Sequence, residues 1–230
     1  MLFQKIQQNI QLFGIPKTIF DLSYRAVNTL TYARIFQGMS LSMADLNPQF
    51  LKLPAPYSWH LLTPSEIASV FNDPVYHISP DFLATAASKN DHCLAIFHGN
   101  RLVSYGWYST KPTRVSRDLI AVFSNNWVYM YRGFTHPDYR GQRLHAHGKA
   151  LALKLYQQKG YKGLLSYAEI NNYRSLRSNY RLGYQNFGKI YIVKIGKYYW
   201  IHAEKGCAQF GFAIIPSYHC QKGHLKYYTS

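Results

Sequence analysis

Hydrophobic residues near the start of this chain recur with helical spacing. One stripe comes before Gly14 and Pro16, which interrupt the pattern: Phe3, Ile6, Ile10 and Phe13. A second stripe follows from Lys17: Phe20, Tyr24, Val27, Leu30 and Arg34. Residues 1–50 therefore read as helical, and the proline-containing run 53–56 ends what we expect to be a helical N-terminal extension over residues 1–56.

From residue 57 to residue 203 short β-rich runs alternate with helical segments. The predicted strands are 57–62, 94–97, 101–108, 126–131, 164–168, 190–195 and 198–203. The predicted helices begin at a capping box in 63–66, and two longer ones cover 143–158 and 172–182. Short turns join 94–97 to 101–108 and 190–195 to 198–203, so both pairs read as hairpins and the sheet is not wholly parallel.

These elements predict an α/β fold with a mixed, mostly antiparallel central sheet flanked by helices. We expect this domain to cover residues 57–203. Residues 204–230 are expected to form a C-terminal tail packed on the domain.

The segment 134–145 follows a strand-like aromatic run and opens a helix, with Arg140 and Arg143 in the turn. The first amides of a helix have no intrahelical partner, and the helix dipole places positive charge at the same end. Such a turn is suited to binding a phosphate. The segment therefore predicts a ligand that carries phosphate groups.

The charge balance supports an anionic partner. The chain has 26 basic and 10 acidic residues, a net charge of +16, and its 47% hydrophobic content argues against disorder. A field of this sign favours nucleotide cofactors, nucleic acid, acidic carrier proteins or an anionic membrane surface. The alternative is a basic protein without a charged partner.

Cysteine usage and the N-terminus suggest a reduced, cytoplasmic setting. Cys93, Cys207 and Cys220 have neither the spacing of a metal site nor that of a disulfide framework, and Cys93 is expected to be a buried hydrophobe. Polar residues break residues 1–15, so no signal peptide is evident. No apolar run approaches the roughly 18 residues that a membrane span needs.

Two segments in this order carry a resemblance to a known family. Residues 135–142, Thr-His-Pro-Asp-Tyr-Arg-Gly-Gln, resemble the pyrophosphate-binding strand-turn-helix of the GNAT superfamily of acyl-CoA-dependent N-acyltransferases. Glu169-Ile-Asn-Asn172, followed by Ser175 and Leu182-Gly-Tyr184, is similar to that family's second motif. Hairpins before and after both segments match the family's order. The resemblance covers residues 57–203 and implies transfer of an acetyl or longer acyl group from acyl-CoA to a primary amine.

The resemblance also implies roles for individual residues. Phe134 and Thr135 match positions whose backbone amides pair with the pantetheine arm of CoA. Asn172 and Ser175 match groups that meet the pantetheine and later parts of CoA. The loop expected to hold the pyrophosphate consists of Arg140, Gly141, Gln142, Arg143, Leu144 and His145.

This chain departs from the family pattern at three positions. Arg143 and His145 stand where small residues are usual, and small residues let backbone approach a phosphate closely. Arg143 would add a charge-assisted contact to the phosphate if its side chain reaches it, or is otherwise a solvated residue. A tyrosine of the family that protonates the departing thiolate is replaced by Asn179, and Tyr180 follows about 100° further around the helix. We therefore take Tyr180 as a candidate acid, against a packing role.

Transfer to an amine also requires removal of a proton from the nucleophile. Carboxylates are scarce, and Glu169, at the corner between a strand and a helix, is the candidate base; a capping role is the alternative. His136, His145 and His147 read as turn or packing residues, and no metal-binding pattern is visible.

Two other functions stay open at this stage. A catalytically degenerate domain could bind nucleic acid through its basic surface and 21 tyrosines. Alternatively, an acyltransferase could take its acyl group from an acyl carrier protein, or act at the inner face of a membrane through residues 1–36.

Overall fold

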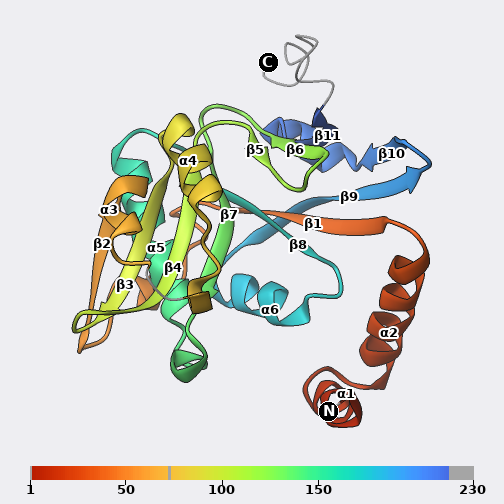
Figure 1. The fold of residues 1–230 in the computed structure, drawn as a ribbon, viewed down its shortest axis with the longest axis horizontal. Coiled ribbons are helices and arrows are strands. Elements are labelled where there is room, and N and C mark those ends of the chain that lie inside the picture. The colour runs from red at the N-terminus through yellow and green to blue at the C-terminus, as the bar shows by residue number, and fades with distance from the viewer. Residues whose placement is uncertain (1, 72–73, 218–230) are drawn as a thin grey trace.

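The structure, a computed structural model, describes residues 2–71 and 74–217 (Figure 1). Its α-helices are α1 (Leu2–Phe13), α2 (Ile15–Leu30), α3 (Pro64–Ala68), α4 (Pro80–Lys89), α5 (Leu144–Gln158) and α6 (Tyr173–Leu182). Its strands are β1 (Ala33–Leu41), β2 (Tyr57–Leu62), β3 (His92–His98), β4 (Arg101–Ser109), β5 (Thr113–Arg114), β6 (Leu119–Val122), β7 (Val128–Thr135), β8 (Leu164–Glu169), β9 (Gln185–Ile195), β10 (Tyr198–Ala203) and β11 (Ala213–Pro216).

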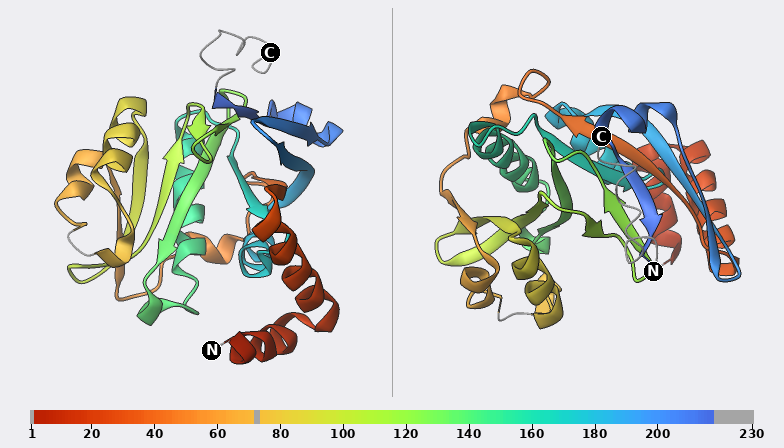
Figure 2. Two further views of the ribbon diagram at one scale, coloured as in Figure 1. Left: turned by 45° about the vertical axis from the view of Figure 1, so that its right-hand side comes forward. Right: turned by 90° about the horizontal axis from the view of Figure 1, so that it is seen from above.

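Eight strands form the main sheet, in the order β10-β9-β1-β8-β7-β4-β3-β2. Its paired strands are antiparallel except β7 and β8, which run parallel. The fold class predicted from the sequence, a mixed and mostly antiparallel sheet flanked by helices, is confirmed. A smaller sheet of β11, β6 and β5 lies over the main sheet (Figures 1 and 2).

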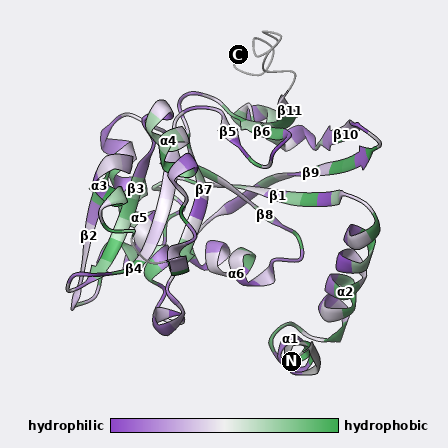
Figure 3. Ribbon diagram, viewed as in Figure 1, coloured by the Kyte–Doolittle hydropathy of each residue, from purple (hydrophilic) through white to green (hydrophobic). Residues whose placement is uncertain are grey.

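The core is divided between the two faces of the main sheet. One apolar cluster joins α5 to the sheet, with Leu144, Leu151 and Leu153 buried against strand residues such as Met39 and Leu164. On the other face, side chains of the main sheet pack against the smaller sheet and the segment before β11. A third cluster lies between α3, α4 and the β3–β4 hairpin. The hydropathy colouring shows hydrophobic and hydrophilic residues interspersed along the strands (Figure 3).

The N-terminal segment is the main correction to the sequence-based prediction. Helices α1 and α2 are present, but residues 33–41, read as helical with Arg34 on the helix stripe, form β1 between β8 and β9. Helix α2 ends at Leu30, and the backbone of Thr31 is extended. From Phe36 onward every residue of β1 is buried, so the strand lacks the polar alternation that identifies a half-buried strand. Gly38 permits this packing, because the Phe187 ring occupies the space of a side chain there.

Most other predicted elements are found. Thr63 and Glu66 form the expected capping box, and both hairpins are present. Helix α6 begins after Asn172, whose side chain accepts from the amide of Ser175, and ends at Gly183. Cys93 is fully buried in β3. Helix α4 and the smaller sheet were not predicted, and Cys220 lies outside the described residues.

Candidate functional site

The parallel strands β7 and β8 separate after a short contact. They pair only at Val128 with Leu164 and Tyr129 with Leu165. On its other edge β7 stays paired with β4 as far as Thr135, with a register shift between Trp107 and Tyr108. The edge of β7 that faces β8 is therefore not covered by that strand beyond Tyr129.

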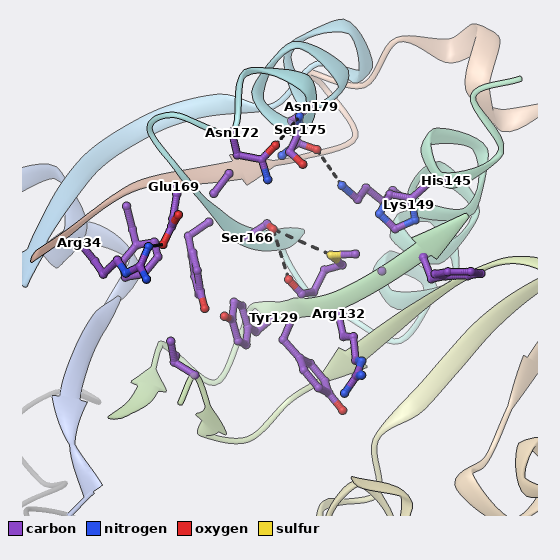
Figure 4. A pocket seen from close by; sticks show the side chains of 18 of the residues that line it. Arg34, Tyr129, Arg132, His145, Lys149, Ser166, Glu169, Asn172, Ser175 and Asn179 are labelled. Carbon is purple, nitrogen blue, oxygen red and sulfur yellow. Dashed lines mark hydrogen bonds and ion pairs between the residues drawn. The ribbon is translucent and has the colours of Figure 1, made fainter. Parts of the chain in front are cut away.

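A cavity of about 580 Å³ occupies this separation, and we call it the wedge cavity. Its walls come from β7, β8, β1 and the starts of α5 and α6 (Figure 4). The Ser166 hydroxyl, which lines the cavity, donates a hydrogen bond to the Met130 carbonyl at 3.2 Å. This bond links β8 to β7 just beyond their paired residues. Five aromatic residues are part of its lining: Tyr32, Phe36, Tyr129, Tyr131 and Tyr167.

A second cavity, of about 400 Å³, lies at the start of α5, and we call it the cationic cavity. Arg140, Arg143 and Arg174 line it. The first hydrogen bonds of α5 run from the amides of Ala146 and His147 to the Arg143 carbonyl, so the amides of Leu144 and His145 precede them. Arginine side chains and free helix amides at one place form an anion site.

The turn before α5 reaches its shape through left-handed backbone. Gly141 has φ +87° and Arg143 has φ +61°. Glycine adopts this conformation without strain, whereas arginine does so at a cost. The position of Arg143 is thus one where a glycine would fit the backbone.

The two cavities are adjacent. Five residues line both of them: Thr135, His145, Lys149, Ser175 and Asn179. A phosphate-bearing molecule held in the cationic cavity would therefore lie next to the wedge cavity.

His145 lies at this junction, beside Lys149 (Figure 4). A Cβ atom on Gly133 would come within 2.2 Å of His145 Cε1, so the ring rests against the backbone of β7. Desolvation, with the charge of Lys149 as a further cause, holds the pKa of the His145 imidazole well below its usual value. The side chain is therefore neutral at pH 7 and narrows the path between the cavities.

The predicted cofactor-binding residues are placed as follows. Phe134 and Thr135 line the wedge cavity, and Asn172 and Ser175 face it from α6. Gly141 lines the cationic cavity, but the Gln142 side chain accepts a hydrogen bond from Tyr57 and does not line it. The Leu144 side chain is buried in the core, so its backbone amide is the group that could bind a phosphate. The structure thus brings residues from segments 134–145 and 172–175 to the two cavities.

Glu169 lines the wedge cavity at the end of β8. Its Oε1 accepts from Nη1 of Arg34 at 2.9 Å, and both side chains are about a third exposed. Glu169 also lines a third cavity, of about 470 Å³, between helices α1 and α2 and the turn before α6. There Asp21 is buried and accepts hydrogen bonds from Arg25 and Asn171.

Tyr180 lies away from these cavities. It is 45% exposed, its hydroxyl donates to Asn186 at 3.2 Å, and it lines none of the three cavities described. Its neighbour Asn179 is 3% exposed and faces the junction instead.

Sequence reasoning did not single out Lys149. This residue of α5 is 6% exposed, and its Nζ donates to Oδ1 of Asn179 at 2.7 Å. A signal was present: Lys149 stands four residues after His145, between Gly148 and the apolar run 150–153. The small and apolar residues on both sides of Lys149 indicate the buried face of the helix.

Two searches of the described residues were negative. No group of three or more His, Cys, Asp or Glu side chains there could hold a metal ion. None of the described helices is both long and apolar enough to cross a bilayer.

No protein-family model matches this chain, and a search of curated proteins finds no match. Solved structures do resemble it. They include a Drosophila protein (16% identity, 81% of this chain and 59% of that one, TM-score 0.47). A GCN5-related N-acetyltransferase-like protein from Streptococcus suis is another (13% identity, 79% and 67%, TM-score 0.48).

A third is AAC(6')-Iy in complex with the bisubstrate analogue CoA-S-monomethyl-acetylneamine (13% identity, 57% of this chain and 92% of that one, TM-score 0.44). This chain spans 59% of the length of the first of these structures, so it matches only part of that protein. Other structures that resemble it, at 12–14% identity and TM-scores of 0.47–0.49, are described as GNAT-family or GCN5-related acetyltransferases.

Proposed function

We propose that this protein is an N-acyltransferase that takes its acyl group from acyl-CoA. The observation that carries the proposal is the adjacency of the two cavities: a cationic cavity at a helix N-terminus shares five lining residues with a wedge between two parallel strands. A linear donor with phosphates at one end and a reactive acyl group at the other matches this arrangement.

The donor would be held by backbone and arginine. Its phosphates would meet Arg140, Arg143 and the first amides of α5, where charge-assisted hydrogen bonds are strong. Its arm would follow the edge of β7 that β8 leaves uncovered, beside Phe134 and Thr135. The donor is an anion, and the net charge of +16 would accelerate its association.

The acceptor amine would approach from the end of the wedge cavity that holds Arg34 and Glu169 (Figure 4). An amine attacks only when uncharged, so a group or a water chain must take its proton. Glu169 is the carboxylate that lines this cavity, and we assign it the role of base. The ion pair with Arg34 holds the carboxylate in place.

The reaction would be direct transfer without a covalent enzyme intermediate. The amine nitrogen bonds to the thioester carbonyl carbon, and the bond from that carbon to sulfur breaks. Holding both substrates in one cavity supplies most of the rate enhancement. A backbone amide of β7 that faces the wedge would stabilise the developing negative charge on the carbonyl oxygen.

The first test measures ligand binding by thermal shift, with CoA, acetyl-CoA and long-chain acyl-CoA as probes. A ligand that binds only the folded state stabilises it by about 2.7 kcal/mol at a hundred times its Kd. We expect the melting temperature to rise with CoA concentration. The absence of any shift at saturating CoA, together with salt-dependent RNA binding, would favour the nucleic-acid-binding alternative instead.

The second step measures release of the CoA thiol from whichever acyl-CoA binds. Primary amines of different classes serve as acceptors: an amino acid, a polyamine, an aminoglycoside and a lysine peptide. Thiol release that depends on the amine, with the acylated amine found by mass spectrometry, supports the proposal. Binding of CoA without any acyl transfer would contradict it.

A further inference from the structure

Lys149 is a lysine that α5 carries into the interior. Its Nζ contacts Asn179 Oδ1 at 2.7 Å and lies 5.5 Å from the centre of the Tyr184 ring. In the described part of the chain no carboxylate lies within ion-pair distance of it. A buried ammonium without a carboxylate partner is costly, and an apolar side chain would stabilise the fold better. The position therefore calls for an explanation other than stability.

Lys149 and Glu169 mark opposite ends of the wedge cavity. Lys149 lies beside His145 at the junction with the cationic cavity, and the Arg34–Glu169 pair lies at the far end (Figure 4). A donor anchored by its phosphates enters past Lys149, whereas the acceptor approaches Glu169. Both side chains line the wedge cavity, so a thioester that lies between them would have the carboxylate on the side of the amine and the ammonium on the side of the sulfur.

We propose that Lys149 is the catalytic acid that protonates the departing thiolate of acyl-CoA. This inference rests on the proposed function. As the bond between the carbonyl carbon and sulfur breaks, sulfur keeps the electron pair and takes a proton from the Lys149 ammonium. The attacking nitrogen loses its own proton to Glu169 or water, and solvent returns a proton to Lys149. No oxidant or further reactant is needed.

The groups that face Lys149 are consistent with this role. Burial lowers the pKa of Lys149 from its ordinary value to about 7, so the ammonium is a usable acid at neutral pH. His145 on the same helix is neutral, because its pKa lies well below the usual value. Burial raises the pKa of Tyr184, so this neighbour stays protonated. Arg132 of β7 and Glu169 of β8 line the same cavity.

The test compares wild type with Lys149→Met, which keeps the length of the side chain and removes the acid. The matched control is Lys154→Met, the same change on the exposed side of α5. We expect Lys149→Met to bind CoA with a Kd within about threefold of wild type and to lose about 100-fold in kcat, at the low end for general acid catalysis. Lys154→Met should match wild type in both.

The pH dependence separates an acid from a merely structural residue. The ratio of wild-type to Lys149→Met kcat should fall about tenfold per pH unit above the pKa of Lys149, because only the protonated lysine donates. Ionisation of the acceptor cancels in this ratio. A ratio that does not change with pH, or a lost kcat that coincides with lost CoA binding, would overturn the proposal.

Folding of the variant is not expected to be a problem. The folded state lowers the pKa of Lys149, so below pH 7 the lysine must be charged and buried, and Met removes that cost. The gain in the free energy of unfolding should be largest below pH 7 and vanish as the pH rises towards the ordinary lysine value. As a second variant, Lys149→Arg keeps the charge but is too weak an acid. Full activity of Lys149→Arg would also overturn the proposal.

Failure of this inference can be told from failure of the proposed function. Wild type that binds no CoA, or binds it without acyl transfer to any amine, contradicts the proposed function and the inference with it. Wild type that transfers acyl groups while Lys149→Met does so equally well contradicts the inference alone.

Discussion

At the scale of a single residue, Arg143 combines a strained backbone with a charge in the phosphate site. It lies in the left-handed region and lines the cationic cavity. A side chain there costs about 1–2 kcal/mol. Glycine also gives the unfolded chain more conformational freedom, which lowers the free energy of unfolding by about 0.4–1 kcal/mol. The relief of strain equals or exceeds the entropy term, so position 143 can be changed without loss of the fold.

We predict that Arg143→Gly weakens CoA binding about fivefold. This change corresponds to the loss of roughly 1 kcal/mol, the contribution of an exposed charge contact. Its melting temperature should be unchanged or slightly higher. Arg143→Asn is the companion variant, because asparagine tolerates the left-handed region without the added freedom of glycine. Titration calorimetry with CoA measures both. Unchanged or tighter binding in the two variants would reject a contact between Arg143 and phosphate.

Residues such as Arg143 could be predicted as candidates from the sequence, because the pattern that indicates them lies within a short segment. The Arg-Gly turn, the asparagine cap of α6 and the candidate base Glu169 all follow from short segments. Tyr180 is a residue whose orientation could not be predicted in this way. One helical position decides whether a side chain faces a cavity or solvent, and that direction depends on how α6 packs against α5 and the sheet. Lys149 was missed because its burial is likewise a property of packing.

At the scale of elements, the site depends on how closely α5 approaches β7. Gly133 of β7 and His145 of α5 meet where the two cavities join. We predict that Gly133→Ala lowers stability by about 1–3 kcal/mol, because the new Cβ forces the imidazole to move. It should also weaken CoA binding, since the displaced ring narrows the path further.

The double variant Gly133→Ala with His145→Ala checks this explanation. Removing the ring leaves room for the new methyl group, so stability and CoA affinity should both recover relative to Gly133→Ala alone. Urea unfolding and titration calorimetry on the four proteins of the cycle give the coupling energy. Additive effects would show that Gly133 matters for another reason, such as its contact with Met130.

At the scale of the whole molecule, the N-terminal segment was the hardest to predict. Local patterns identified the hairpins and α5, whose partners are close in sequence. By contrast, β1 pairs with β8 and β9, more than a hundred residues away, and both faces of the strand are buried. Nothing in its own sequence distinguishes such a strand from a buried helix. In the smaller sheet β6 pairs with β11, which lies 91 to 97 residues away, although β5 and β6 are close in sequence.

The α1–α2 helix pair projects from the body (Figures 1 and 3). It exposes apolar side chains. Leu30 is 88% exposed, and seven others are at least 38% exposed: Ile10, Leu12, Ile15, Ile19, Phe20, Leu22 and Val27. Apolar patches of this kind commonly mark interaction surfaces. Because the protein carries a net charge of +16, an anionic bilayer is a surface that would attract it.

We predict that the protein co-sediments with vesicles containing phosphatidylglycerol and much less with neutral phosphatidylcholine, and that added salt weakens the binding. Ile15→Ser with Ile19→Ser should reduce it, because both side chains are largely exposed and their loss leaves the core intact. A chain lacking residues 1–31 should lose it while keeping β1 and the wedge cavity. If instead all of these proteins sediment alike, the α1–α2 helix pair does not bind membranes.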